Sequence, residues 1–202
     1  MPDGLHRLRE RMPAAAIGIE VFSIVLGVLL ALGVNEWRGA RANTELAHRA
    51  VTQIRSEVER NGEVMGSRHP YHAAALDSIQ GFVANLDPGI GLDDVSPGRL
   101  GFGRGGQFIP LYSSAYASAQ SSGALAHVDY ETLTLLSSIY ETQRTLLEQD
   151  GRVMDLLFAP ANLRSGTFYY TLSLAEGLMQ DVVGSEEALL ELYDRFEAAV
   201  PE

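Results

Sequence analysis

Apolar residues fill one unbroken stretch near the start of the chain. Residues 14–34 read AAAIGIEVFSIVLGVLLALGV, twenty-one positions in which Glu20 is the one charged residue. A helix of this length spans about 31 Å at a rise of about 1.5 Å per residue, which matches the bilayer's hydrocarbon core of about 30 Å. The pattern predicts a transmembrane helix over residues 14–37, preceded by a short basic tail over residues 1–13.

Two other interpretations compete for the same stretch. A cleaved signal peptide would begin with Arg7, Arg9 and Arg11 and end in a small-residue site such as Ala31 and Gly33 offer. Its apolar region is usually about 7–15 residues long, however, which is shorter than this one. A buried core helix is the third interpretation, but apolar runs of this length are uncommon in soluble proteins. We therefore favour an uncleaved anchor.

The flanks of the stretch bear on its orientation in the membrane. Three arginines precede it and three follow it, so the positive-inside rule gives a tie. A short tail with three arginines resists translocation, whereas a long domain translocates largely regardless of charge. We expect the N-terminus in the cytoplasm and the large domain outside. Trp37 and Arg38 then lie at the far interface, where aromatic rings are common.

Small residues recur at intervals of four inside the predicted span, at Ser23, Gly27 and Ala31. This spacing places them on one helix stripe, which lets a second helix approach closely. Glu20 lies near the same stripe and has two interpretations. It is either an interfacial acid that reaches the headgroups or a polar contact between helices.

Helical periodicity continues after the span without a clear break. Apolar residues fall on one seam with intervals of 4, 3, 4 and 7: Ala47, Val51, Ile54, Val58 and Met65. We expect this helix to end near Gly66 and the His69–Pro70 pair, and a second helix to run from Tyr71 to Leu86. The seam covers fewer than three heptads, so it indicates the core face of a helical domain rather than a coiled coil.

Residues 87–110 form the least regular part of the chain, with seven glycines and three prolines. A loop of this length inside a compact domain is usually functional or mobile. Helical residues resume at Ser113–Ser122, and Gly123 is a suitable C-terminal stop.

Two long helical segments complete the chain. Asp129 is a good N-cap for a helix with an apolar stripe at Leu133, Leu136, Tyr140 and Leu147. A further stripe over residues 165–183 is closed by Gly184, and Ser185 would cap a last helix with Glu186 and Glu187 in its first turn. Residues 38–202 therefore read as an all-α domain.

Charge and composition limit the classes of molecule that the protein is expected to bind. The net charge is −11, and residues 129–202 carry four arginines against fourteen acids. An acidic domain is repelled by nucleic acid and by anionic headgroups, so neither is expected to bind it. The chain has no cysteine, which excludes disulfides, thiolate metal sites and a cysteine nucleophile.

Gly101, Gly103 and Gly106 match the pattern G-x-G-x-x-G. Dinucleotide binding by this motif needs a strand before it and a helix N-terminus after it, and the prolines nearby leave neither. His69 and His72 form an H-x-x-H pair that would need a distant carboxylate to hold a metal. Surface histidines are the more common outcome.

Other polar clusters have equally plain interpretations. Asp93 and Asp94 are expected to be solvated, and the serines of residues 113–122 form no nucleophile elbow. The acids of residues 186–197 suggest a solvated helix face. Residues 168–170 could line a pocket but more often form core. The sequence thus predicts no catalytic, cofactor or metal residue.

Two segments resemble a known family. The first runs from Glu20 through residues 24–32 into Asn35-Glu36-Trp37-Arg38, and the second joins Ser114-Ala115-Tyr116 to Ser122-Gly123, Leu125 and Tyr140. They resemble a widespread family of uncharacterised bacterial single-span membrane proteins, catalogued as a domain of unknown function. Relatives tend to carry Trp where this chain has Tyr116. The resemblance favours the anchor and implies a bacterial inner membrane, but it implies no activity.

We therefore expect a non-enzymatic, membrane-anchored scaffold or accessory subunit that acts through helix-mediated association. Its partners would be the lipid bilayer and other transmembrane helices, either in a homo-oligomer or in a larger, energy-converting membrane complex. The alternative is an extracytoplasmic small-molecule sensor, with a pocket between the helices that carry Tyr116, Tyr140 and Tyr169. A hydrolase whose residues converge only in three dimensions is the third hypothesis.

Overall fold

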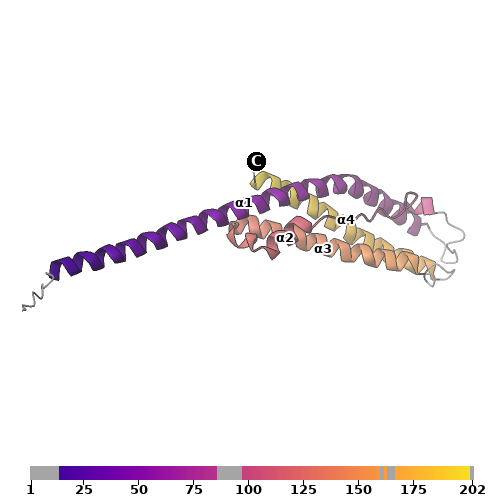
Figure 1. The fold of residues 1–202 in the computed structure, drawn as a ribbon. Coiled ribbons are helices and arrows are strands. Elements are labelled where there is room, and N and C mark those ends of the chain that lie inside the picture. The colour runs from indigo at the N-terminus through magenta and orange to yellow at the C-terminus, as the bar shows by residue number, and fades with distance from the viewer. Residues whose placement is uncertain (1–13, 86–96, 160–161, 163–166, 201–202) are drawn as a thin grey trace, which may run out of the picture. The chain divides into compact units, whose positions relative to one another are not determined.

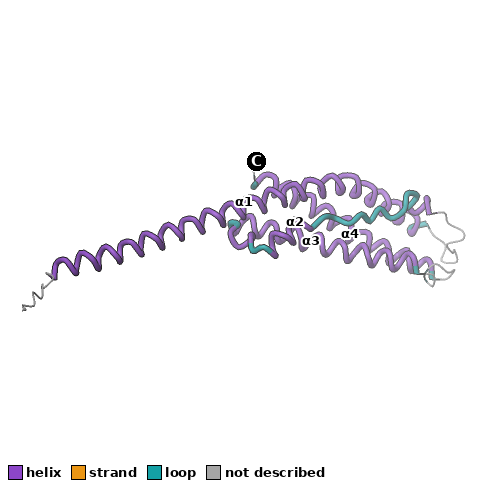
Figure 2. The backbone as a smooth tube through the Cα atoms, in the orientation of Figure 1, coloured by secondary structure: helices purple, strands orange, loops and turns teal. Residues whose placement is uncertain are grey.

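The computed structural model describes residues 14–85, 97–159, 162 and 167–200. Helices dominate it (Figures 1 and 2), in the order α1 (Ala14–Val83), the 3-10 turn η2 (Pro97–Leu100), α2 (Ser114–Ser121), the 3-10 turn η3 (Ala124–His127), α3 (Tyr130–Phe158) and α4 (Phe168–Ala199). The described residues contain no β-strand. The expected all-α class with one long apolar N-terminal helix is confirmed.

The chain divides into two units, residues 1–45 and residues 46–202, and α1 contributes to both. The predicted end of the membrane span at Trp37 falls inside the first unit and stays a prediction. The predicted basic tail over residues 1–13 lies outside the described residues, as do residues 87–96 of the predicted loop.

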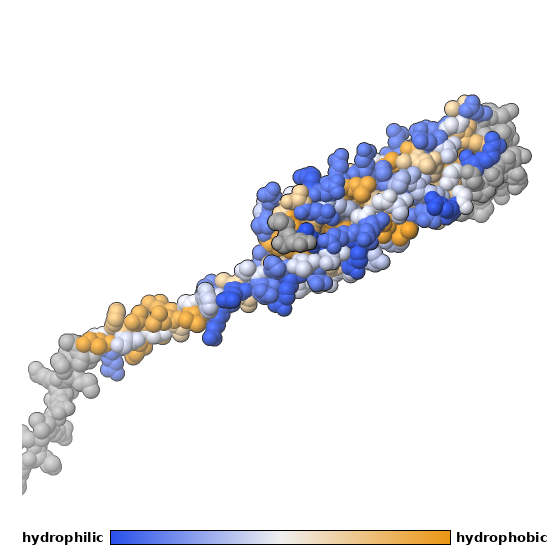
Figure 3. Space-filling view, turned by 90° about the horizontal axis from the view of Figure 1, so that it is seen from above, coloured by the Kyte–Doolittle hydropathy of each residue, from blue (hydrophilic) through white to orange (hydrophobic). Residues whose placement is uncertain are grey.

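In the first unit, α1 presents apolar side chains all round. An 18-residue window with a mean hydropathy of 2.0 has none of its residues buried. Phe22, Leu29 and Leu30 are each at least 60% exposed. Figure 3 shows this apolar surface as a run of orange side chains along the first part of the helix. Because complete burial of a large apolar side chain is favourable by about 1.5–3 kcal/mol, a non-aqueous or protein environment would stabilise this surface.

In the second unit, α1 from residue 46 onward packs with α3 and α4. Contacts between Glu57 and Tyr140 and between Arg68 and Asp150 show that α1 and α3 run in the same direction. α4 runs the opposite way (Figure 1). The helices share one apolar core that includes Ile54, Leu136 and Val182, each with no exposed surface.

Buried positions on all three helices alternate in steps of four and three residues. They include 54, 58, 61, 65, 68, 72, 75 and 79 on α1, 132, 136, 139, 143, 146, 150 and 153 on α3, and 168, 172, 175, 179, 182, 186, 189, 193 and 196 on α4. This is the 3.5-residue repeat of coiled-coil packing, in which each core residue inserts between residues of a facing helix. The prediction that the α1 seam is the core face of a helical domain is confirmed, and Asn61, Arg68 and His72 extend that seam beyond the apolar residues.

The predicted end of the first helix near Gly66 and Pro70 is also wrong. α1 continues through Pro70 to Val83. A proline inside a helix removes one backbone hydrogen bond and costs about 3 kcal/mol. Pro70 lies on the exposed side, where water can reach the freed Gly66 carbonyl. Burial of Met65 and Ile79 on the opposite face offsets the cost.

The predicted break at Gly184 and the cap at Ser185 are wrong for a related reason. α4 runs without interruption from Phe168 to Ala199. A glycine in a helix costs only about 1 kcal/mol relative to alanine, and burial of the apolar Val182 and Leu189 on either side outweighs it.

Two other helix boundaries are as predicted, while one stripe position is not. The Asp129 side chain caps α3 by accepting from the Thr132 amide at 2.9 Å. α2 ends before Gly123, whose φ of 75° suits glycine. Leu147, however, was expected in the core and is 60% exposed, whereas its neighbour Leu146 is buried.

Candidate functional site

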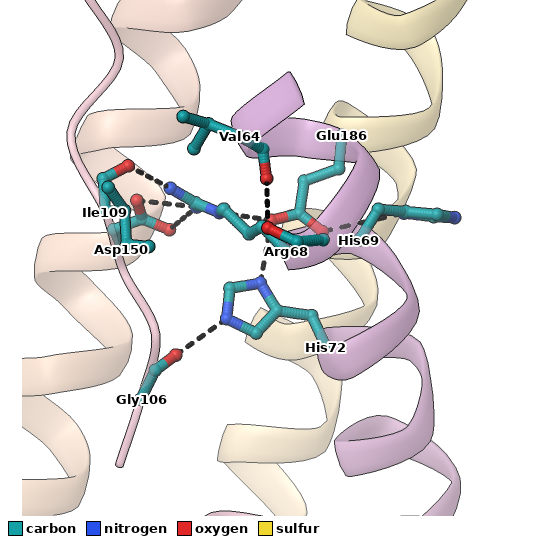
Figure 4. Close-up of polar contacts among 9 residues, drawn as sticks. Val64, Arg68, His69, His72, Gly106, Ile109, Asp150 and Glu186 are labelled. Carbon is teal, nitrogen blue, oxygen red and sulfur yellow. Dashed lines mark hydrogen bonds and ion pairs between the residues drawn. The ribbon is translucent and has the colours of Figure 1, made fainter. Parts of the chain in front are cut away.

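The core of the second unit contains a fully buried arginine, Arg68 of α1, that joins four segments (Figure 4). Its Nε donates to Glu186 Oε1 of α4 at 2.6 Å, and its Nη2 donates to both carboxylate oxygens of Asp150 of α3 at 2.6 and 2.7 Å. Its Nη1 donates to the Ile109 carbonyl at 3.0 Å. One guanidinium therefore holds all three long helices and the segment before α2.

His72 lies one turn further along α1 and is also fully buried. Its Nδ1 is 2.7 Å from Glu186 Oε1, and its Nε2 is 2.7 Å from the Gly106 carbonyl oxygen. A carbonyl only accepts, and so does an ionised carboxylate. With Glu186 ionised, the acceptors on both sides call for a hydrogen on each ring nitrogen, whereas a protonated Glu186 would itself donate to Nδ1. His69, a quarter exposed, has its Nδ1 3.5 Å from Glu186 Oε2, and neither of these two atoms has a hydrogen-bond partner.

The charges of this cluster, which we call the core network (Arg68, His72, Asp150 and Glu186), balance when His72 is protonated. Two cations then face two carboxylates. Burial raises the pKa of Asp150, and the hydrogen bonds from Arg68 oppose that rise. Removing one partner from such a buried set leaves an uncompensated charge, which costs about 3–5 kcal/mol. The core network therefore demands that its helices and the adjoining segment assemble in one register.

Residues 101–113, which we call the connector, run along α1 without helix or ladder partners of their own, apart from one isolated bridge between Gly103 and Gly105. α1 side chains satisfy connector backbone groups instead. Asn61 donates to the Tyr112 carbonyl at 2.8 Å and accepts from the Tyr112 amide at 2.7 Å. Together with Arg68 and His72, it binds the connector at three levels of the helix.

The connector backbone packs closely against α1 at Gly101. A Cβ atom at this position would lie 2.5 Å from the Ala75 Cα, and the φ of Gly101 is 82°. Both facts require glycine, because other residues would clash and strain the backbone. The first glycine of the G-x-G-x-x-G pattern thus serves close packing against α1. A 3-10 turn precedes it and the next α-helix begins only at Ser114, so the arrangement needed to hold a dinucleotide is not formed in the described segment.

A third buried acid, Glu57, holds the start of α2. Its Oε2 accepts from the Ala115 amide at 2.7 Å and from the Ser114 hydroxyl at 3.1 Å. Its Oε1 accepts from the Tyr140 hydroxyl at 2.7 Å. Ser113, the N-cap residue, makes no capping bond with its own side chain. A carboxylate from α1 therefore takes that role, which suits the positive end of a helix dipole.

A cleft of about 310 Å³ opens beside the core network. Its lining includes Arg68, Asp150, Leu147 and the stacked rings of Tyr116 and Tyr140, whose centroids are 4.0 Å apart. The pocket expected between the helices of Tyr116, Tyr140 and Tyr169 is thus formed in part. Tyr169 is not among the lining residues and packs against Tyr170 instead.

Several predicted positions need correction. His72 was expected at the surface and is fully buried. Glu186 was expected on a solvated helix face and is also fully buried, although Glu187, Glu191 and Glu197 of that stretch are exposed. Both errors share one cause. His72 and Glu186 were each assigned to the first turn of a separate helix, whereas each lies in the interior of a long one.

Other predicted positions lie where they form no site with the core network. Six residues of the first unit are exposed on α1: Glu20, Ser23, Gly27, Ala31, Trp37 and Arg38. Phe168 is buried and Tyr170 is 73% exposed. Asp93 and Asp94 lie outside the described residues. Within the described ranges, no group of three or more His, Asp or Glu side chains could hold a metal ion.

The buried tyrosines generate a prediction about alkaline pH. Burial raises the pKa of Tyr140 above its usual value, as does its hydrogen bond to Glu57, and burial also raises that of Tyr193. Unfolded tyrosines ionise near pH 10, so the folded state then holds more protons and stability falls as pH rises through that value. Absorbance at 295 nm of the folded chain should show Tyr140 and Tyr193 silent up to the unfolding pH. Tyr140→Phe should leave the titrated amplitude unchanged, whereas Tyr130→Phe, at an exposed position, should lower it. A loss of amplitude with Tyr140→Phe would contradict the assignment.

Comparison with family models, with curated proteins and with solved structures finds no match for this chain. The resemblance to an uncharacterised single-span family therefore stays a prediction.

Proposed function

We propose that the protein is a non-enzymatic, membrane-anchored helical bundle that works by associating with other membrane proteins or with copies of itself. One observation carries the proposal: the apolar first part of α1 has no buried residue in its most apolar window. Such a surface is stable in lipid or against other apolar helices, and unfavourable in water.

The length and ends of the segment support an anchor. Residues 14–37 extend about 36 Å as a helix, enough to cross a hydrocarbon core of about 30 Å. Trp37 lies at the polar end with the Arg41 guanidinium 5.9 Å from its ring centre. An aromatic ring and a cation at this point suit a membrane interface, because the ring lies at headgroup depth and the cation is attracted to lipid phosphate.

The proposal includes a location. The anchor would make a single pass through a bacterial inner membrane, with the N-terminal tail in the cytoplasm and the bundle in the periplasm. The bundle would bind neither nucleic acid nor anionic lipid, because both are negatively charged and most of the chain's net charge of −11 lies in its distal half.

Association would use the stripe of small residues in the anchor. Gly27 is exposed, and a Cβ added there would meet no atom within 4 Å, so the position is open to a second helix. Ser23 and Ala31 lie one turn away on either side and are exposed as well. The partner helix would come from a second copy of this chain or from a larger, energy-converting complex to which the protein is an accessory subunit.

The test combines membrane extraction with sizing of the full chain. The protein should stay in the membrane pellet after alkaline carbonate treatment. In mild detergent, Gly27→Leu with Ala31→Leu should reduce the particle size or release co-purifying proteins. Gly33→Leu is the matched control, because Gly33 is exposed off the stripe. Extraction by carbonate would contradict the anchor, and an unchanged size and partner set would contradict association through the stripe.

A second candidate function is small-molecule sensing in the cleft beside the core network. The stacked Tyr116 and Tyr140 rings and the buried Asp150 carboxylate supply apolar walls and a polar group. A volume of about 310 Å³ is at the lower end of the range for ligand pockets.

Thermal-shift screening of the full chain against a metabolite library tests this candidate. A ligand should raise the melting temperature of the wild type by several degrees. Ala117→Trp should abolish the shift, because Ala117 lines the cleft and a large side chain would fill it. Ala126→Trp, at an exposed position outside the cleft, should preserve the shift. No shift, or an equal shift with Ala117→Trp, would contradict binding in the cleft.

A further inference from the structure

We infer that the His72–Glu186 pair holds one proton that fastens the connector to α1, and that this attachment weakens as the pH rises. The His72 ring makes two close contacts, one through each of its nitrogens. His72 Nδ1 lies 2.7 Å from Glu186 Oε1, and Nε2 lies 2.7 Å from the Gly106 carbonyl oxygen. The side chains of both His72 and Glu186 have no exposed surface, so water cannot replace either contact.

Both contacts at once need a shared proton. A neutral imidazole carries a single N–H, so beside an ionised Glu186 it would turn a lone pair toward an oxygen 2.7 Å away. If the pair holds one further proton, on His72 or on Glu186, both close contacts are hydrogen bonds. The geometry therefore indicates that the pair holds one proton more than a neutral imidazole and an ionised carboxylate together.

The charges around His72 favour retention of that proton. From α1, Arg68 and His69 face the pair, while Asp150 approaches from α3 and Glu186 from α4. The connector contributes the Gly106 carbonyl and the Phe108 ring, 4.9 Å from the imidazole. Tyr71 flanks the imidazole, and the Arg104 guanidinium stacks on the Tyr71 ring.

Arg68 and the two carboxylates sum to one negative charge. The proton therefore brings the core network to neutrality, which is the stable condition for buried charges. His69 is the partly exposed member of the group, and its Nδ1 lies 3.5 Å from the Glu186 Oε2 that has no hydrogen-bond partner.

Linkage gives the sign of the effect. The two short contacts require the extra proton in the folded state only. Where a histidine of the unfolded chain is neutral, the folded state therefore binds one more proton than the unfolded state, so stability falls as pH rises. The unfolding equilibrium constant should increase by up to about tenfold per pH unit until the folded proton leaves. Because Pro110 and Leu111 of the connector line the cleft, release of the connector also changes that cleft.

Urea unfolding of the full chain in mild detergent, between pH 6.5 and 9, tests the inference. Wild type should show the rise of up to about tenfold per pH unit, and His72→Gln should flatten it. His127→Gln, which removes an exposed histidine from η3, is the control and should keep the wild-type slope. A wild-type slope of zero, or an undiminished slope in His72→Gln, would overturn the inference.

A second measurement does not depend on a variant that folds. Nitrogen NMR of the wild type, labelled with ¹⁵N at its five histidines, should show at pH 7.5 one ring that shares or holds a hydrogen at both nitrogens. Amide exchange, corrected for its intrinsic pH dependence, should show lower protection of residues 105–113 at pH 9 than at pH 7. Five ordinary neutral rings at pH 7.5, or equal protection at both pH values, would overturn the inference.

Discussion

Arg68 imposes the constraint on which the second unit depends. A guanidinium without exposed surface must have its charge balanced and its hydrogen bonds made, or the fold loses several kilocalories per mole. Asp150 and Glu186 supply the charges from two other helices, and the Ile109 carbonyl supplies a further acceptor. Apolar side chains alone would tolerate a shift of one helix along another. The arginine does not, because its donors reach their acceptors in one register only.

The same constraint explains how an irregular segment can lie against a helical core. The connector has backbone groups that no ladder satisfies, and burying them unpaired would be unfavourable. Asn61, Arg68 and His72 meet that need from successive levels of α1. Polar residues at core positions thus do two things at once: they align the helices and they bind the connector, which in turn forms one wall of the cleft.

The sequence was sufficient for the helical class, for the apolar N-terminal segment and for local signals such as the Asp129 cap and the stop at Gly123. It failed at helix continuity, because the pattern of apolar residues has gaps at Asn61, Arg68, His72 and Glu186. These gaps are core positions occupied by polar groups that are buried only because partners distant in sequence neutralise them. When polar residues are counted as core positions, the alternating spacing of four and three residues extends the buried seam of α1 beyond Pro70. The identity of the partners was beyond reach, since Arg68 and Glu186 are 118 residues apart.

The apolar first part of α1 and the helical bundle thus differ: the first leaves its apolar side chains exposed, whereas the second closes on itself around a buried charge. A double-mutant cycle between Arg68 and Glu186, each replaced by Met in the full chain, tests the central claim most directly. Each single change should cost about 3–5 kcal/mol, and the double change should cost less than their sum by about 2–3 kcal/mol. A matched cycle on the exposed Arg144–Glu148 pair should show no measurable coupling. Additive effects of the Arg68 and Glu186 changes would contradict the claim that this pair fixes the register of the bundle.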